Sequence, residues 1–208
     1  MLIDLTVTDF LDELASDSPA PGGGSVAALN GALGAGLIAM VARLTIGKKG
    51  YDAVQSLMEE TRDGADRLKQ RLTELVDEDT QAFNAVMAAF KLPKETDEDK
   101  AARSAAIQAG YQQAIHTPME TAESCLAVLE LAAAIAGKGN ANAASDLGVA
   151  AQVAYAGVEG AVMNVKINLP AIKDETWKQA QSDATADILS RAVTFKETVS
   201  AKTAELIG

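Results

Sequence analysis

The feature that most constrains this 208-residue chain is an apolar run from Val26 to Ala42, in which Asn30 is the only polar side chain. A run of this length can form either a membrane span or a helix that is buried on all sides. Gly31, Gly34 and Gly36 interrupt the run, and no belt of Trp or Tyr flanks it as at a membrane interface. The run therefore favours a helix at the centre of a helical bundle or at a subunit interface, and no membrane association is expected.

The rest of the chain predicts further helices and no strand. Aromatic residues make up only 4% of the chain, and no segment alternates between apolar and polar residues as a half-buried strand does. The helices expected are 6–16, 25–45 with Ser25 as N-cap, 51–90, one opening at a Thr96–Asp99 capping box, one from Thr117–Pro118 to Gly137, one from Ser145 or Asp146 to just before Pro170, and 174–206. Short connections between long helices predict one all-α domain over residues 1–208, an up-and-down bundle.

Charge and cysteine content limit the partners and the compartment. The net charge of -11 argues against nucleic-acid binding, which needs Lys and Arg to neutralise phosphates. Cys125 is the only cysteine, so no intrachain disulfide is possible, and the acidic N-terminal segment does not resemble a signal peptide. His116 is the only histidine, which excludes a multi-histidine metal site. We expect a cytoplasmic protein.

Asp79 is the residue most suggestive of chemistry. On a helix it shares one face with apolar residues only, namely Leu72, Leu75, Val76, Phe83, Val86 and Phe90. A carboxylate in an apolar stripe is costly, and burial raises its pKa, so Asp79 is a candidate general acid or base. The alternative is a structural aspartate that pairs with a lysine or caps a neighbouring helix. Asp77 and Glu78 point away from this stripe and are expected to be solvated.

A glycine turn precedes the apolar helix. Gly22, Gly23, Gly24 and Ser25 place backbone amides at a helix N-terminus, where partial positive charge accumulates. The turn lacks the Gly-Lys-Ser/Thr ending of a phosphate-binding loop and the preceding strand of a dinucleotide-binding motif. It is either a ligand site or a helix start that lets two backbones approach closely.

Three further polar groups are candidates for ligand binding. The first group lies in the loop 137–146 and consists of Lys138, Asn140, Asn142 and Asp146. The second group lies on the helix after this loop and consists of Asn164 and Asn168, which follow small residues on the same helix face. The third group is a cation cluster around a glycine: Arg43, Lys48 and Lys49. Small residues followed by amides can line a cleft for a polar heteroaromatic ligand, and the cations can hold an anion. Equally, the small residues permit tight packing, the asparagines cap chain ends, and the cations are a solvated helix end.

Four segments resemble one known family when they are taken in order and spacing. They are "SDSPAPGGGSVAAL", "LTIGKKGY", "LVDEDTQAF" and "GKGNANAASDLGVAAQVAYAGVEGAVMNVKINL". Together they resemble the cyclodeaminase/cyclohydrolase family that acts on one-carbon tetrahydrofolates. The resemblance covers roughly residues 5 to 170, and "FKLPKETDEDKAAR" is similar to the stand-alone cyclohydrolases of that family.

The resemblance implies a helical dimer that holds folate between its helices. It places the family's aspartate at Asp79, its asparagine-rich loop at Asn140, Asn142 and Asp146, and the glycine turn beside the folate. It implies a methenyltetrahydrofolate cyclohydrolase or, as the alternative, a formiminotetrahydrofolate cyclodeaminase, with neither a metal nor a redox cofactor. The glutamate tail of the folate would then bind Arg43, Lys48, Lys49 and Lys138. A non-catalytic helical binding or scaffold protein remains a further alternative.

Overall fold

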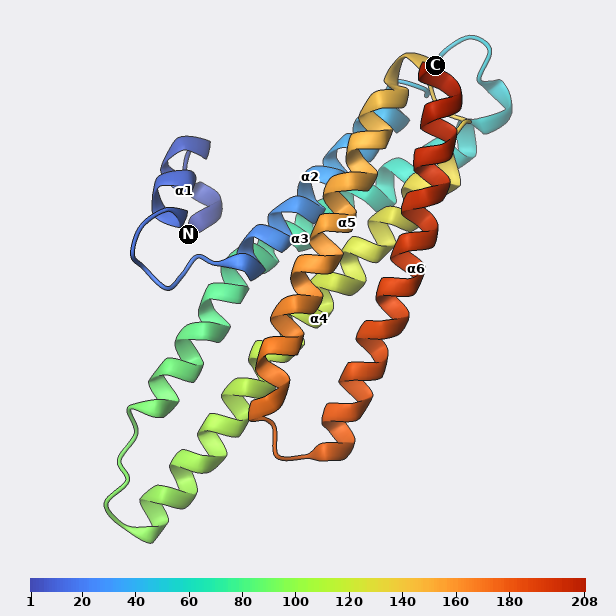
Figure 1. The fold of residues 1–208 in the computed structure, drawn as a ribbon. Helices are drawn as coiled ribbons and strands as arrows, with labels where there is room; N and C mark the ends of the chain where they lie inside the picture. Colours follow the sequence, from blue (N-terminus) through green and yellow to red (C-terminus); the bar gives the residue numbers. More distant parts are fainter.

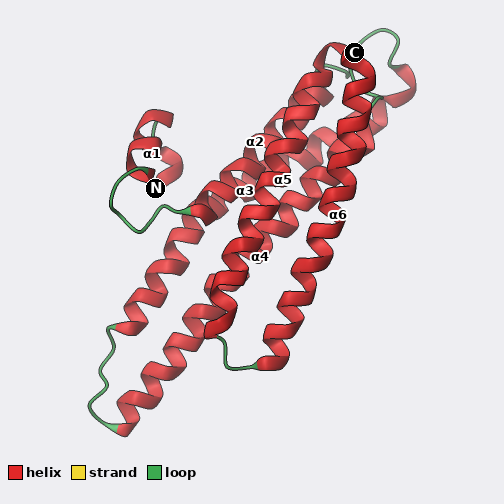
Figure 2. Ribbon diagram, in the orientation of Figure 1, coloured by secondary structure: helices red, strands yellow, loops and turns green.

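The computed structural model describes all residues 1–208 and is a bundle of five long helices with a short helix beside it (Figure 1). The long helices alternate in direction: α2 (Gly23–Arg43), α3 (Gln55–Phe90), α4 (Asp97–Ile135), α5 (Ala144–Asn168) and α6 (Glu175–Ile207). The short helix is α1 (Val7–Leu14), and 3-10 turns occupy Leu2–Asp4, Asp52–Val54, Ala141–Ala143 and Leu169–Ala171. Figure 2 shows helices and loops only, which confirms the predicted all-α, up-and-down bundle.

Helix α2 lies at the centre of the bundle, packed against α3, α4 and α5. It is the one helix long and apolar enough to cross a membrane, but 61% of its most apolar window is buried inside the bundle. Small residues make this packing possible: a Cβ on Gly31 would lie 2.9 Å from Leu72 Cδ2, and one on Gly157 would lie 2.9 Å from the Ala27 carbonyl oxygen. Gly31 of the apolar run and Gly157 of α5 therefore serve close helix packing.

The first residues of three predicted helices cap those helices. The Thr6 hydroxyl accepts from the Asp9 amide at 3.1 Å, and the Asp174 carboxylate accepts from the Trp177 amide at 3.0 Å. Thr96 and Asp99 form the predicted capping box, with each side chain accepting the other residue's amide. These caps were predictable because each depends only on residues three positions apart.

Two predicted helix starts are wrong. Helix α2 begins at Gly23 with Gly22 as its N-cap, and Ser25 lies inside the first turn, where its hydroxyl is 2.8 Å from the Val76 carbonyl. Helix α5 begins at Ala144, so neither Ser145 nor Asp146 caps it. The Asn140 side chain instead accepts the Asn142 amide at the 3-10 turn that leads into α5.

The predicted break at Thr117–Pro118 is also wrong, because α4 runs through it without interruption. A proline inside a helix cannot donate to the carbonyl four residues earlier, which here belongs to Ala114. The Asn168 side chain of α5 donates to that carbonyl at 3.2 Å. A donor from another helix thus replaces the missing intrahelical bond.

Asp77 and Glu78 are not solvated as predicted. Asp77 is buried, and its Oδ1 accepts the backbone amide of Leu2 at 2.6 Å, so the N-terminal turn covers it. Glu78 is half-buried and forms a two-pronged ion pair with Arg71, which also binds Glu120 of α4. The helical periodicity of α3 does not reveal that residues from elsewhere in the chain cover this side.

Candidate active site

A cavity of about 280 Å³ opens where α2 begins, between the second half of α3, the first half of α4 and the end of α5. Four helices contribute to its wall because α2 is shorter than its neighbours and starts midway along them (Figure 1). Its lining residues are Pro19, Ala20, Gly22, Gly23, Gly24, Asp79, Ala82, Phe83, Val86, Met87, Phe90, Tyr111, Ala114, Asn164 and Asn168. The structure therefore brings together the predicted aspartate, the glycine turn and the second asparagine pair.

Asp79 is held by the first turn of α2. Its Oδ2 accepts the Ser25 amide at 3.0 Å, and the Ser25 hydroxyl lies 3.3 Å from the same oxygen. Oδ1 accepts no hydrogen bond from the protein, which leaves it available to a ligand in the cavity. Burial raises the pKa of Asp79, and the two Ser25 hydrogen bonds only partly oppose that shift. The carboxyl group is thus fixed at one oxygen and free at the other.

Gly24 is the residue that makes room for this carboxyl group. A Cβ at Gly24 would lie only 2.6 Å from Asp79 Oδ2 and closer still to the other carboxylate atoms. No side chain fits there while Asp79 keeps its position. The close approach at Gly24 is thus made by the carboxyl group of Asp79, the candidate catalytic group, and not by a second backbone. The same turn also lines the cavity, so its role as a ligand site stays a prediction.

Asn164 and Asn168 line the cavity one turn apart on α5. The Asn164 amide nitrogen donates to the Gly160 carbonyl at 2.8 Å, and that of Asn168 donates to the Asn164 and Ala114 carbonyls. Neither side-chain oxygen accepts a hydrogen bond from the protein. Two fixed acceptors are therefore left for a ligand that offers N–H groups. The role of Pro118 follows from this, because it frees the carbonyl of Ala114 that orients Asn168.

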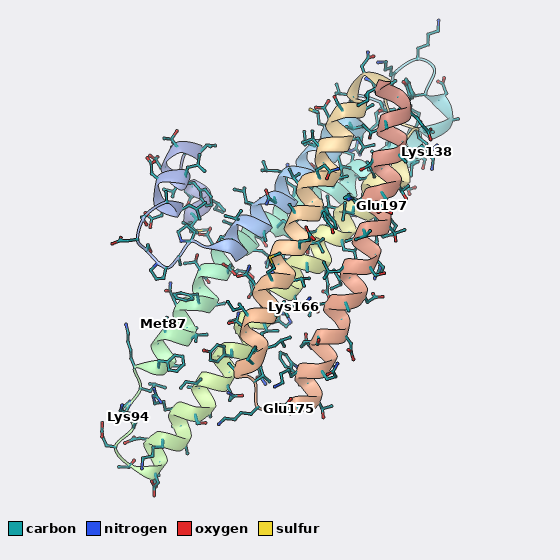
Figure 3. The ribbon with its side chains drawn as sticks, in the orientation of Figure 1. Met87, Lys94, Lys138, Lys166, Glu175 and Glu197 are labelled. Carbon is teal, nitrogen blue, oxygen red and sulfur yellow. The ribbon has the colours of Figure 1, made fainter.

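The remaining wall is aromatic and apolar. Phe83, Met87 and Phe90 follow one another along α3, and Tyr111 of α4 meets the Phe90 ring edge-on, with 6.2 Å between the ring centroids. Figure 3 labels Met87 on this part of α3. The chain has only four phenylalanines and three tyrosines, and three of these residues line one cavity. Phe83 and Phe90 belong to the apolar stripe predicted from the sequence, whereas Met87 and Tyr111 were not predicted as site residues. The scarcity of aromatic residues in the chain is the sequence signal that could have found this wall.

The other predicted binding residues do not reach this cavity. Helix α2 has 21 residues and is therefore about 30 Å long, with Gly23 at the cavity and Arg43 at the other end. The residues gathered near that far end are Arg43, Lys48, Lys49, Lys138, Asn140, Asn142 and Asp146. The expectation that they share one site with Asp79 is thus wrong within a single chain, because a rigid helix separates the two groups.

Most of these far-end side chains have structural partners. Asn140 joins its own loop, between α4 and α5, to the loop that follows α2. Its Oδ1 accepts a hydrogen bond from Lys48 Nζ at 2.9 Å, and its backbone amide donates to Thr45 Oγ1. Arg43 forms an ion pair with Asp66, and Lys138 donates to a helix-terminal carbonyl. Lys49 and Asn142 are exposed, and Asp146 is half-buried. The asparagine-rich loop therefore stabilises this end of the bundle.

Comparison with known proteins decides the family. The family model described as formiminotransferase-cyclodeaminase matches residues 6–187. The chain belongs to this family. It is 41% identical to a methenyltetrahydrofolate cyclohydrolase of Methylorubrum extorquens, over 93% of each chain. It is 38% identical to the formimidoyltransferase-cyclodeaminase of Rattus norvegicus, over 93% of this chain and 36% of that protein.

The fold of a solved family member agrees. The crystal structure of a formiminotetrahydrofolate cyclodeaminase from Thermotoga maritima superposes with a TM-score of 0.90, covering 100% of both chains at 27% identity. The chain thus spans the whole of that stand-alone relative, and about a third of the length of the bifunctional relative.

Proposed function

We propose that the chain is a methenyltetrahydrofolate cyclohydrolase that converts 5,10-methenyltetrahydrofolate to 10-formyltetrahydrofolate. The observation that carries the proposal is a carboxyl group with one free oxygen, Asp79 Oδ1, in a cavity that also has aromatic walls and amide acceptors. The Methylorubrum extorquens relative, which matches along nearly the full length of both chains, carries this name and supports the choice of reaction.

The reaction adds water to a cationic carbon that bridges two folate nitrogens. Asp79, as the carboxylate, takes a proton from the attacking water, and the hydroxyl oxygen bonds to the bridging carbon. The carbon–nitrogen bond on the pterin side then breaks, and the departing nitrogen receives a proton from the Asp79 carboxyl group. The hydroxyl group on the carbon loses its own proton to solvent as the formyl C=O bond forms, so the reaction consumes one water and releases one proton. The N–H groups of the pterin match the free oxygens of Asn164 and Asn168. The negative charge of Asp79 also stabilises the cationic substrate before water attacks.

The second candidate is formiminotetrahydrofolate cyclodeaminase activity, which the names of the rat and Thermotoga maritima relatives favour. In this reaction the aniline nitrogen attacks a formimino carbon and ammonia leaves. The same carboxyl group can move the required proton, so one cavity suits both reactions.

A spectrophotometric comparison of the two substrates tests the proposal. Methenyltetrahydrofolate absorbs in the near ultraviolet, and we expect the enzyme to remove this band faster than buffer alone at the same pH. Formimino substrate in a parallel cuvette would instead generate the band and release ammonia if the chain were a cyclodeaminase. If the protein acted on neither substrate, the proposed function would be contradicted, and the result would favour a non-catalytic binding or scaffold protein.

We also propose that the chain forms a homodimer through α2 and α5, which pack side by side (Figure 1). Both helices leave large apolar side chains in solvent. On α2 these are Leu33 and Met40, with Leu44 directly after its last residue, and on α5 they are Val149, Met163 and Ile167. Met163 is 65% exposed and Ile167 is 76% exposed. A second copy that covers this face would bury the part of the apolar run that the single chain leaves uncovered.

Light scattering tests this dimer. We expect the mass of two chains at micromolar concentration for the wild type, and of one chain for Leu33→Glu/Met163→Glu, because the variant places charges in the apolar face. Lys202→Glu is the matched control, because it changes the net charge by the same amount at an exposed position of α6, outside the proposed interface; this variant should remain dimeric. A monomeric wild type would contradict the proposal.

A further inference from the structure

A second cavity, of about 270 Å³, lies beside the candidate active site and is lined by cations. It is formed by the loop after α3, the first turns of α4 and the segment before α6, and we call it the basic hollow. Its lining is Lys94, Lys100, Arg103, Ser104, Ile107, Gln108 and Lys173. Lys100 pairs with Asp97 at 2.9 Å. The other three cations form no ion pair with a carboxylate, although the chain carries a net charge of -11.

Arg103 stands on the border between the basic hollow and the active-site cavity. Its guanidinium lies 5.7 Å from the centroid of the Phe90 ring and donates to the Phe90 carbonyl through Nε and Nη2. Phe90 in turn lines the active-site cavity. On the other side of the basic hollow, Lys173 Nζ donates to Ser104 Oγ at 2.9 Å. The two cavities therefore share a wall made of one aromatic ring and one guanidinium.

The chemical character of the wall changes in order along α3. Asp79 comes first, then Phe83, Met87 and Phe90, and Lys94 follows in the loop; Figure 3 labels Met87 and, beyond it, Lys94 at the tip of the bundle. The twelve residues from Asp79 to Phe90 extend about 16 Å along the helix, since eleven rises of about 1.5 Å separate the first from the last. A tetrahydrofolate has the same order of parts: the pterin with the reacting carbon, then an aromatic p-aminobenzoyl ring, then the carboxylates of glutamate.

We propose that the basic hollow binds the glutamate carboxylates of the substrate and so sets its direction in the active site. This rests on the proposed function, because it assigns the far end of the same substrate. The pterin lies at Asp79 and the asparagines, the p-aminobenzoyl ring lies along the α3 aromatic residues, and the carboxylates meet Lys94, Arg103 and Lys173. The glutamate end is therefore assigned to these residues, and the far-end cluster of Arg43, Lys48, Lys49 and Lys138 is not required for it.

The test compares two substrates in two double variants. One substrate is 5,10-methenyltetrahydrofolate, and the other is the corresponding tetrahydropteroate, which lacks glutamate. The variant Lys94→Ala/Lys173→Ala removes two cations of the basic hollow, and Lys49→Ala/Lys138→Ala removes two exposed cations at the other end of α2. Both variants change the net charge equally, so a difference between them reports position.

We expect Lys94→Ala/Lys173→Ala to raise KM for the glutamate-bearing substrate about three- to tenfold, as for two exposed ion pairs. The KM for the pteroate and kcat for both substrates should stay unchanged, because these lysines lie far from Asp79. The Lys49→Ala/Lys138→Ala variant should behave as wild type. Added salt should reduce the ratio of the KM for the pteroate to the KM for the glutamate-bearing substrate. The reason is that exposed charges are screened over about 8 Å at physiological ionic strength.

Two outcomes separate this inference from the proposed function. Equal KM effects of both double variants, or a wild type that does not distinguish the two substrates, would overturn the inference while leaving the cyclohydrolase intact. Absence of turnover would contradict the proposed function. Calorimetric titration with tetrahydrofolate and tetrahydropteroate measures the two dissociation constants without any turnover. Equal dissociation constants for the wild type would also overturn the inference.

Discussion

Replacing Asp79 by Asn is expected to lower kcat about a hundred- to ten-thousandfold while the bundle stays folded. Asn has nearly the same shape and can still accept the Ser25 amide hydrogen bond, but it cannot take a proton from water. The rate of loss of the methenyl absorption band measures the effect, and circular dichroism verifies the fold. Near-normal turnover by the purified variant would show that Asp79 is structural and that another group moves the proton.

The pH dependence provides an independent check on Asp79. Burial raises the pKa of this carboxyl group above its ordinary value, which is about 3.9 for an unperturbed aspartate. The proposed base must be ionised, so kcat/KM should fall as the pH drops through this raised pKa. The acid limb should disappear from the residual activity of Asp79→Asn; an identical limb in both proteins would assign it to another residue.

Stability should change in the opposite sense to activity. Because the pKa of Asp79 is higher in the folded state than in the unfolded state, the folded protein loses stability as the pH rises through the raised pKa. Asn avoids this loss, so Asp79→Asn should be at least as stable as wild type at pH 7. The difference should shrink toward about pH 4, near the pKa of the unfolded chain. Urea unfolding at the two pH values measures it.

Gly24→Ala is expected to reduce activity by about a hundredfold or more, although the substitution adds only one methyl group. The new Cβ would occupy the space of the Asp79 carboxyl group, 2.6 Å from Oδ2, so the carboxyl group must turn away from Ser25 and from its place in the cavity. Displacing a catalytic group by about 1 Å can cost a hundredfold in rate. Turnover numbers of the purified variant measure the loss.

Gly36→Ala is the matched control, because Gly36 lies on the same helix with no atom closer than Lys69 Cδ at 4.0 Å. Alanine is favoured over glycine inside a helix by about 1 kcal/mol. We therefore expect Gly36→Ala to keep full activity and to raise the free energy of unfolding. Equal activities of the two variants would contradict the role given to Gly24.

The amino-acid sequence by itself determined the fold class and pointed to Asp79, which lines the candidate site. Helical periodicity and local capping depend on residues three or four positions apart, and these are visible in any single chain. The Thr96–Asp99 capping box and the apolar stripe around Asp79 are such features, and both lie where they were predicted. The apolar run from Val26 to Ala42 likewise indicated a central helix, and 61% of its most apolar window is buried within the single chain.

Only the tertiary structure decided which polar groups meet. The glycine turn and the asparagine-rich loop carry equally suggestive residues, yet the 21-residue helix α2 lies between them and holds them at its two opposite ends. Pro118 ends no helix because Asn168, fifty residues later in the chain, donates to the carbonyl that the proline leaves free. Asp77 is buried because Leu2 lies over it. Each of these outcomes depends on contacts between residues far apart in the sequence, which the local periodicity of a single helix does not encode.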